Sequence, residues 1–157
     1  MNRLFLIIIL FATACNSQTE NKSETGQPAT SSGDEKLNAA NLEGCYVSIL
    51  NNDTSYLKIE VIESGVTGDL TYNRYQKDKN EGTIKGEIKD SLVVAYYTFE
   101  SEGITSVRQV VFKPSDKGLA EGFGDIVISK TGDTASFKDI STLQFQDSVK
   151  FTKTECQ

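Results

Sequence analysis

The 157-residue chain contains no histidine and no tryptophan, and it has only two prolines and three cysteines. Without histidine the chain cannot form a Ser–His–Asp or Cys–His catalytic set, and it lacks the imidazole ligand of most zinc sites. Basic residues are also in the minority, with 16 Lys and Arg against 22 Asp and Glu. Nucleic acid and anionic lipid both require a basic binding surface. Composition therefore argues against the common hydrolase classes and against nucleic acid as a partner.

The first 14 residues have the features of an export signal. Arg3 supplies a positive charge, and the apolar run Leu4 to Ala12 is much shorter than the ~20 residues that span a bilayer. Small residues then lead directly into Cys15. Residues 1–15 resemble the lipobox signal of bacterial lipoproteins, although leucine is usual where Ala12 stands. The resemblance implies cleavage before Cys15 and acylation of that cysteine. The alternative is an ordinary secretory signal that leaves Cys15 as a free thiol.

A lipid on Cys15 would decide where the mature chain resides. Cleavage removes Arg3 and leaves 15 basic and 22 acidic residues, a formal net charge of −7. Because such a chain is repelled by anionic lipid, attachment must come from the acyl chains, palmitate among them, and two or more chains are needed for stable anchoring. The next residue, Asn16, is not the aspartate that often retains lipoproteins at an inner membrane. We expect a cell-envelope protein on the outer membrane of a bacterium with two membranes.

The two remaining cysteines, Cys45 and Cys156, bracket almost the whole of the region that is expected to fold. Since an exported protein meets oxidising conditions, we predict a disulfide between them. Closing a loop of about 110 residues would stabilise the domain by ~4 kcal/mol in the chain-entropy model. The alternative is two buried free thiols.

The polar segment after Cys15 divides the chain into a tether and a folded domain. Residues 16–38 are rich in Ser, Thr, Glu, Asn, Gln and Lys and contain no aromatic residue, so they cannot bury enough apolar surface to fold. We therefore assign residues 1–14 to the signal, 15–40 to the lipidated cysteine and a disordered tether, and 41–157 to a single domain.

In the domain, apolar residues recur with a period of two, and turn residues interrupt the chain every eight to twelve positions. The strands expected from this pattern cover 44–50, 55–62, 66–72, 83–88, 91–100, 104–113, 119–129, 143–145 and 149–151. Phe137, Ile140 and Leu143 are spaced by three, which allows at most one short helical turn. We predict an all-β fold, an antiparallel meander that closes into a small barrel or sandwich. In general form it is similar to the calycin-like small β-barrels, by analogy only.

Tyrosines and one arginine on neighbouring expected strands are the candidate ligand or partner surface. They are Tyr72, Tyr75, Tyr96, Tyr97 and Arg108. The tyrosines could line a pocket mouth or an interaction face, or simply serve as core and rim packing, which we favour. An arginine within an apolar strand either faces solvent, which we also favour, or enters a barrel and needs an anionic partner.

Three functions fit these features, and we expect no metal, no cofactor and no enzymatic activity. The first is a binding module that captures a small apolar or amphipathic ligand in a cavity lined by Leu70, Tyr72, Val94, Tyr96 and Val110. The second is a protein-binding module, such as an inhibitor of a cationic lysozyme-like enzyme, with a filled barrel and an acidic, tyrosine-bearing patch. The third is a hydrolase that uses paired carboxylates, such as Glu100 with Glu102 or Glu121 with Asp125, although no spacing selects a pair.

Overall fold

The computed structural model of the chain describes residues 39–116 and 118–156, so the predicted signal, Cys15 and most of the tether lie outside the described residues. The described part contains ten strands and two single helical turns, α1 Ala39–Leu42 and the 3₁₀ turn η1 Ile140–Thr142. The turn predicted around Ile140 is therefore present, and α1 is a second one. No helix among the described residues is long and apolar enough to cross a membrane.

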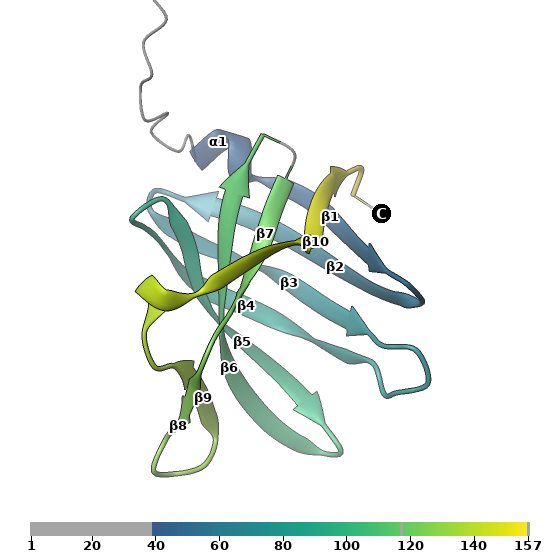
Figure 1. Cartoon of the computed structure of the whole chain (residues 1–157), viewed down its shortest axis with the longest axis vertical. Helices are drawn as coiled ribbons and strands as arrows, with labels where there is room; N and C mark the ends of the chain where they lie inside the picture. The colour runs from purple at the N-terminus through teal and green to yellow at the C-terminus, as the bar shows by residue number, and fades with distance from the viewer. Residues whose placement is uncertain (1–38, 117, 157) are drawn as a thin grey trace, which may run out of the picture. The chain divides into compact units, whose positions relative to one another are not determined.

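Eight of the strands form a closed antiparallel barrel (Figure 1), which confirms the predicted antiparallel all-β fold and decides between the barrel and the sandwich that the sequence left open. β1 to β7 follow one another as a meander, and β10 lies between β7 and β1 and closes the ring. The strands are β1 Gly44–Leu50, β2 Asp53–Ile62, β3 Gly65–Asn73, β4 Asn80–Lys89, β5 Leu92–Ser101, β6 Ile104–Ser115, β7 Gly118–Phe123, β8 Ile126–Ile128, β9 Thr134–Phe137 and β10 Gln144–Thr154.

Alternation along the strands separates an apolar lumen from a polar outer face. In β2, Leu57 and Ile59 are buried, whereas Lys58 and Glu60 are exposed and form an ion pair of 2.7 Å. Leu57 stands opposite Leu70 of β3, and directly opposed residues point to the same side of a sheet. The same alternation continues around the barrel, so the inward-facing side chains of all its strands fill the lumen. They include Tyr46, Leu57, Ile59, Val66, Leu70, Ile84, Val93, Val110, Phe112, Leu119 and Phe151.

One end of the barrel, here called the capped end, holds the first and last described residues. Leu42 of α1 is buried, and its carbonyl oxygen accepts a 2.8 Å hydrogen bond from the Tyr46 hydroxyl. Cys45 and Cys156 form the predicted disulfide, with their Cα atoms 5.1 Å apart. β1 and β10 are therefore joined both by backbone pairing and by a covalent bond.

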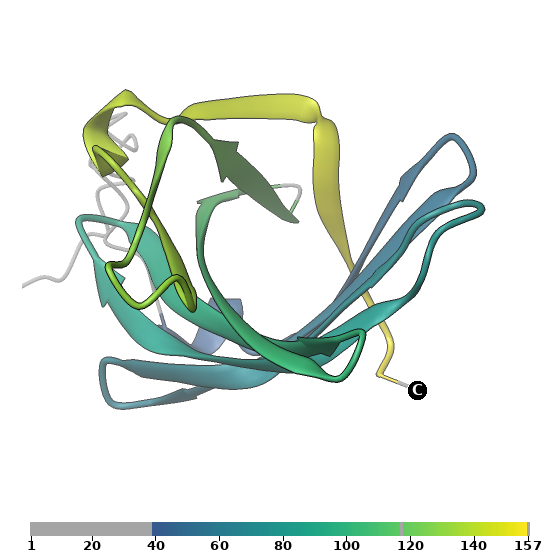
Figure 2. The same ribbon diagram turned by 90° about the horizontal axis from the view of Figure 1, so that it is seen from below.

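The opposite end, here called the hairpin end, is formed by the turns β1–β2, β3–β4 and β5–β6 and is seen along the barrel in Figure 2. Here β6 and β7 separate, because their pairing extends only from Ser115–Gly118 to Phe112–Glu121. The short ribbon of β8 and β9 lies beside the free part of β6, where Val107 pairs in parallel with Thr134. The Gln109 side-chain oxygen accepts a 2.9 Å hydrogen bond from the Phe137 backbone and fixes this ribbon.

In this last part of the chain the strands differ from the sequence prediction in three places. The expected strand 119–129 is two strands, β7 and β8, separated at Gly124 and Asp125. β9 was not predicted, because it is short and polar and pairs with β6 over only two residues. The expected segments 143–145 and 149–151 belong to one strand, β10, whose pairing with β7 shifts register between Phe145 and Lys150.

Candidate functional site

Three of the five candidate residues meet inside the barrel towards the hairpin end. Tyr72 of β3 and Tyr97 of β5 are 3% and 0% exposed. Arg108 of β6 stands opposite Tyr97 in the antiparallel register, so both side chains leave the same side of the sheet. The Arg108 guanidinium carbon lies 5.1 Å from the centre of the Tyr72 ring and 6.0 Å from that of Tyr97. The arginine therefore forms cation–π contacts with two buried rings.

This position of Arg108 corrects the sequence interpretation, which favoured solvent. β6 carries apolar residues at the consecutive positions Val110 to Phe112, so alternation of apolar and polar residues could not show which side of the sheet Arg108 faces. That Arg108 faces the interior follows instead from the pairing of Tyr97 with Arg108 and of Ala95 with Val110, because paired residues point to the same side of the sheet. Arg108 is half-buried, since its long side chain lies on the aromatic faces.

Glu121 of β7 is the carboxylate of this cluster, and it is 5% exposed. Its Oε1 atom accepts a hydrogen bond of 2.5 Å from the Tyr72 hydroxyl. Burial raises the pKa of Glu121 above its ordinary 4.5, while the Tyr72 hydrogen bond and the positive charges of Arg108 and Arg74 act in the opposite direction. Burial, together with the charge of Glu121, raises the pKa of Tyr72 well above 10.0. The cluster thus holds a carboxyl group for which loss of its proton is costly.

The Tyr97 hydroxyl is fully buried and has no hydrogen-bond partner among the described residues. The ring is well packed, because it stacks on Phe99 at 4.7 Å and meets the Tyr72 ring edge-on at 5.7 Å. Burial raises the pKa of Tyr97 to about 12. A buried hydroxyl without a partner costs about 1–3 kcal/mol. Tyr97 is therefore an unused donor in an otherwise well-packed site.

A second arginine, Arg74, is held at the edge of the cluster by Asp53. One guanidinium nitrogen lies 3.2 Å from Asp53 Oδ2, and the Tyr75 backbone N–H donates to Asp53 Oδ1 at 2.8 Å. The hydrogen bond from Tyr75 and the adjacent Arg74 lower the pKa of Asp53. Asp53 thereby joins the start of β2 to the β3–β4 loop. Tyr75 in this loop is 58% exposed.

Exposed apolar side chains gather at the hairpin end. They belong to the end of β1, the β3–β4 loop, the start of β6, and strands β7 and β8. We call them the apolar rim: Ile49, Tyr75, Ile104, Phe123, Ile126, Val127 and Ile128. At the capped end Ile62, the last residue of β2, is the counterpart and is 71% exposed. Exposed apolar residues that cluster at one place are typical of an interaction site, whereas single ones are ordinary.

The cavity predicted from the sequence was wrong in two of its five residues. Leu70, Tyr72 and Val110 are buried in the lumen, but Val94 and Tyr96 are on the outer face of β5, where Tyr96 is 43% exposed. In β5 apolar residues occupy consecutive positions, so alternation could not distinguish Tyr96 from Tyr97. Tyr75 and Tyr96 consequently do not join the cluster formed by Tyr72, Tyr97 and Arg108.

The carboxylate pairs considered for a hydrolase are not assembled in one cleft. Glu121 is buried in the lumen, whereas Asp125 is exposed between β7 and β8. Glu100 and Glu102 are both exposed at the β5–β6 hairpin. Within residues 39–116 and 118–156, no group of three or more carboxylates or cysteines is placed to hold a metal ion.

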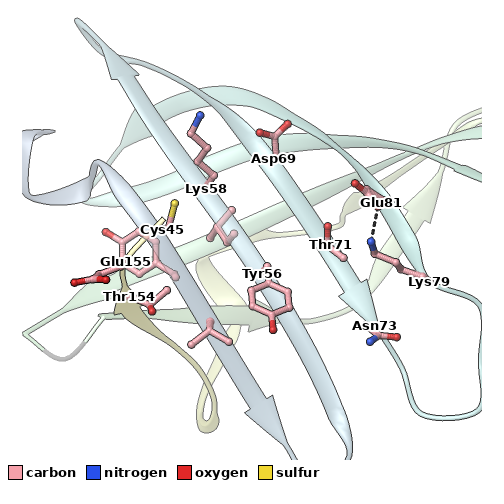
Figure 3. A pocket seen from close by; sticks show the side chains of 13 residues that line it. Cys45, Tyr56, Lys58, Asp69, Thr71, Asn73, Lys79, Glu81, Thr154 and Glu155 are labelled. Carbon is pink, nitrogen blue, oxygen red and sulfur yellow. Dashed lines mark ion pairs between the residues drawn. The ribbon is translucent and has the colours of Figure 1, made fainter. Parts of the chain in front are cut away.

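A groove of about 680 Å³ lies on the outer face of β1 to β4, away from the lumen (Figure 3). Tyr56 lies within it and is 46% exposed. Charges of both signs line it, and Lys79 and Glu81 form an ion pair of 2.6 Å. The other charged lining residues are Lys58, Asp69 and Glu155. The groove is thus polar and mixed in charge, with one exposed tyrosine.

Comparison with protein-family models, with curated proteins and with solved structures finds no match for this chain.

Proposed function

We propose that this chain is a lipid-anchored, non-enzymatic binding module of the cell envelope that holds a small amphipathic ligand at the hairpin end of its barrel. The observation that carries the proposal is that the apolar rim lies at the end of the barrel towards which the buried polar cluster of Arg108, Tyr72, Tyr97 and Glu121 is placed. An amphipathic molecule fits this arrangement, because its apolar part contacts the rim and its polar part reaches the cluster.

The packing of the lumen restricts where such a ligand lies. Side chains from Leu57, Val66, Phe112 and Phe151 are at most 1% exposed and fill the lumen from its middle to the capped end. A ligand therefore sits across the hairpin end and does not extend along the barrel axis. This differs from the deep cavity that we expected from the sequence.

The direction of the chain supports the same location. The described chain begins in α1 at the capped end, opposite the apolar rim. In the proposal, Cys15 is acylated, the polar tether joins the domain at the capped end, and the hairpin end is free to meet a ligand. The Cys45–Cys156 disulfide supports an exported, oxidising location.

Native mass spectrometry of the chain purified from its own envelope tests the proposal. We expect a retained small molecule, and we expect Ile104→Glu to remove it because a charge in the apolar rim opposes apolar contact. Ile62→Glu is the matched control, since Ile62 is 71% and Ile104 67% exposed at opposite ends of the barrel. Retention that is equal in both variants would contradict binding at the hairpin end.

A second candidate is a protein-binding module that inhibits a cationic lysozyme-like enzyme. The filled lumen and the groove beside Tyr56 favour it, although the groove is not strongly acidic. Binding to a purified cationic lysozyme should then weaken with Tyr56→Ala and with added salt, and Tyr96→Ala, on another part of the outer face, should bind as the unchanged chain does. If the lysozyme does not bind, this candidate fails.

A further inference from the structure

We infer that the polar part of the ligand is an anion with at least two acceptor oxygens, a carboxylate or a phosphate, and that Arg108 and the Tyr97 hydroxyl bind it. The inference rests on the proposed function and names the chemical class of its ligand. The sequence raised an anionic partner for Arg108 only as the less favoured alternative, because Arg108 was expected in solvent.

Arg108 is a cation whose N–H donors have no acceptor among the described residues. Within the described residues it takes part in cation–π contacts with Tyr72 and Tyr97, and it forms no hydrogen bond or ion pair. Contacts through ring faces leave the N–H groups of a guanidinium unused, and these form a fork that matches a carboxylate or phosphate. A half-buried cation without an acceptor is costly, and an anion removes that cost.

Arg74 provides an internal comparison. It also lies near the Tyr72 ring, at 5.4 Å, but Asp53 accepts its hydrogen bond at 3.2 Å. The two arginines therefore differ in their acceptors: Arg74, the more exposed of the two, has a carboxylate partner, and Arg108 has none among the described residues. That difference selects Arg108 as the anion-binding group.

The Tyr97 hydroxyl is an independent sign of a missing acceptor. It is fully buried, it is without a partner among the described residues, and it belongs to the residue directly opposite Arg108. Opposed residues in an antiparallel pair have Cβ atoms about 5 Å apart, so one oxyanion can be reached by both side chains. A hydroxyl and a guanidinium from neighbouring strands thus form a two-residue anion site.

Glu121 is the group that opposes an anion here. The charged and titratable groups that act on it are Tyr72, Arg74 and Arg108. The Tyr72 hydroxyl already donates to its carboxyl oxygen, and burial raises the pKa of Glu121. Burial is the larger influence and reduces the negative charge that Glu121 offers to a ligand beside Arg108, whereas the Tyr72 hydrogen bond acts in the opposite direction and favours the ionised carboxylate.

Calorimetric titration of the full chain carrying Cys15→Ala, which removes the expected acylation site, tests the inference. The probes are octanoate, octyl phosphate and the neutral octanol. We expect at least one of the anions to bind about tenfold more tightly than octanol, because a charge-assisted hydrogen bond to a buried group has that effect. Arg108→Gln should abolish the difference, and Lys85→Gln, an exposed cation on the outer face of β4, should leave it unchanged.

Tyr97→Phe separates a ligand contact from a structural role. Removing a hydroxyl that lacks a partner should leave thermal stability unchanged or raised, while anion affinity falls severalfold. Tyr96→Phe, one residue away on the outer face, should change neither quantity. Unchanged anion affinity in Tyr97→Phe would remove that hydroxyl from the site.

The outcomes distinguish the inference from the proposed function. If octanol binds as tightly as both anions, or Arg108→Gln changes nothing, the anion site is wrong and binding at the hairpin end stands. If none of the three probes binds, both are wrong. A preference for octanoate identifies a free fatty acid as the source of the anion, and a preference for octyl phosphate identifies a phospholipid.

Discussion

The two ends of the barrel differ in how completely their polar groups are hydrogen-bonded and their apolar side chains are buried. At the capped end, Leu42 is buried, the Tyr46 hydroxyl has an acceptor, and a disulfide joins Cys45 to Cys156. At the hairpin end, a buried hydroxyl has no partner among the described residues, a half-buried arginine lies on aromatic faces, and apolar residues are exposed. The first end is built for stability, and the second retains unsatisfied groups that a ligand can use.

This contrast has a physical basis in the cost of recognition. Groups that are fully satisfied within the fold gain little from a partner, whereas unused donors and exposed apolar surface gain a great deal. A small domain can carry such groups at one end only if the rest of the fold supplies the stability. The filled lumen and the covalent closure at the capped end meet that requirement.

The largest expected effect comes from opening the capped end. The double substitution Cys45→Ser and Cys156→Ser removes a disulfide that closes a loop with a sequence separation of 111 residues. In the chain-entropy model the free energy of unfolding falls by about 4–5 kcal/mol. Urea denaturation of the variant measures it, and the unchanged chain under reducing agent should give the same curve. A loss below about 1 kcal/mol would show that backbone pairing alone closes the barrel.

A smaller effect is expected from the apolar contacts of the two ends. Leu42→Ala should lower the free energy of unfolding by roughly 3 kcal/mol, because it removes a buried side chain and leaves a cavity beneath α1. Ile104→Ala removes an exposed side chain at the hairpin end and should change stability by about 0.5 kcal/mol or less. Thermal and urea unfolding compare the two variants. Equal losses would mean that the ends do not differ in packing.

The sequence predicted the architecture because its signals are local. Alternation in Leu57 to Val61, turn residues such as Gly103 at φ 77°, and two cysteines bracketing the domain indicated an antiparallel barrel or sandwich with a disulfide, and the structure confirms the disulfide and shows the barrel. The strands after Gly118 were less predictable. β8 and β9 are three and four residues long, and their place is set by long-range contacts such as that between Gln109 and Phe137.

The site was predicted only in part, for a similar reason. Tyr72, Tyr97 and Arg108 were named as candidates. Whether they meet depends on which residues of β5 and β6 face the lumen, and apolar residues occupy both faces of these strands. Tyr96 and Tyr97 cannot be told apart by composition, and only the register places one inside. Glu121 was named only as half of a carboxylate pair with Asp125. Its hydrogen bond to Tyr72 joins residues 49 positions apart, which no local pattern in the sequence indicates.

The smallest expected effect concerns the pH dependence of the hairpin end. The folded-state pKa of Glu121 is raised by burial, so the unfolded chain releases this proton at lower pH than the folded chain does. The stability contributed by the protonated carboxyl is therefore complete below the unfolded pKa near 4.5 and is lost as the pH rises through the folded value. Glu121→Gln keeps an acceptor for the Tyr72 hydroxyl but cannot ionise. We expect this variant to gain stability relative to the unchanged chain as the pH rises from about 4 to 7, as measured by urea denaturation at each pH.

Tyr72→Phe provides a second test of Glu121, because it should extend the pH dependence that Glu121→Gln removes. The Tyr72 hydroxyl favours the ionised carboxylate by donating a hydrogen bond to it, so removing that hydroxyl should raise the folded-state pKa of Glu121 further and extend the loss of stability to higher pH. In the double variant Tyr72→Phe with Glu121→Gln this extension should disappear, because no ionisable group is left at position 121. A pH dependence that persists in the double variant would assign the effect to another carboxylate of the domain and would remove the titratable group from the hairpin end.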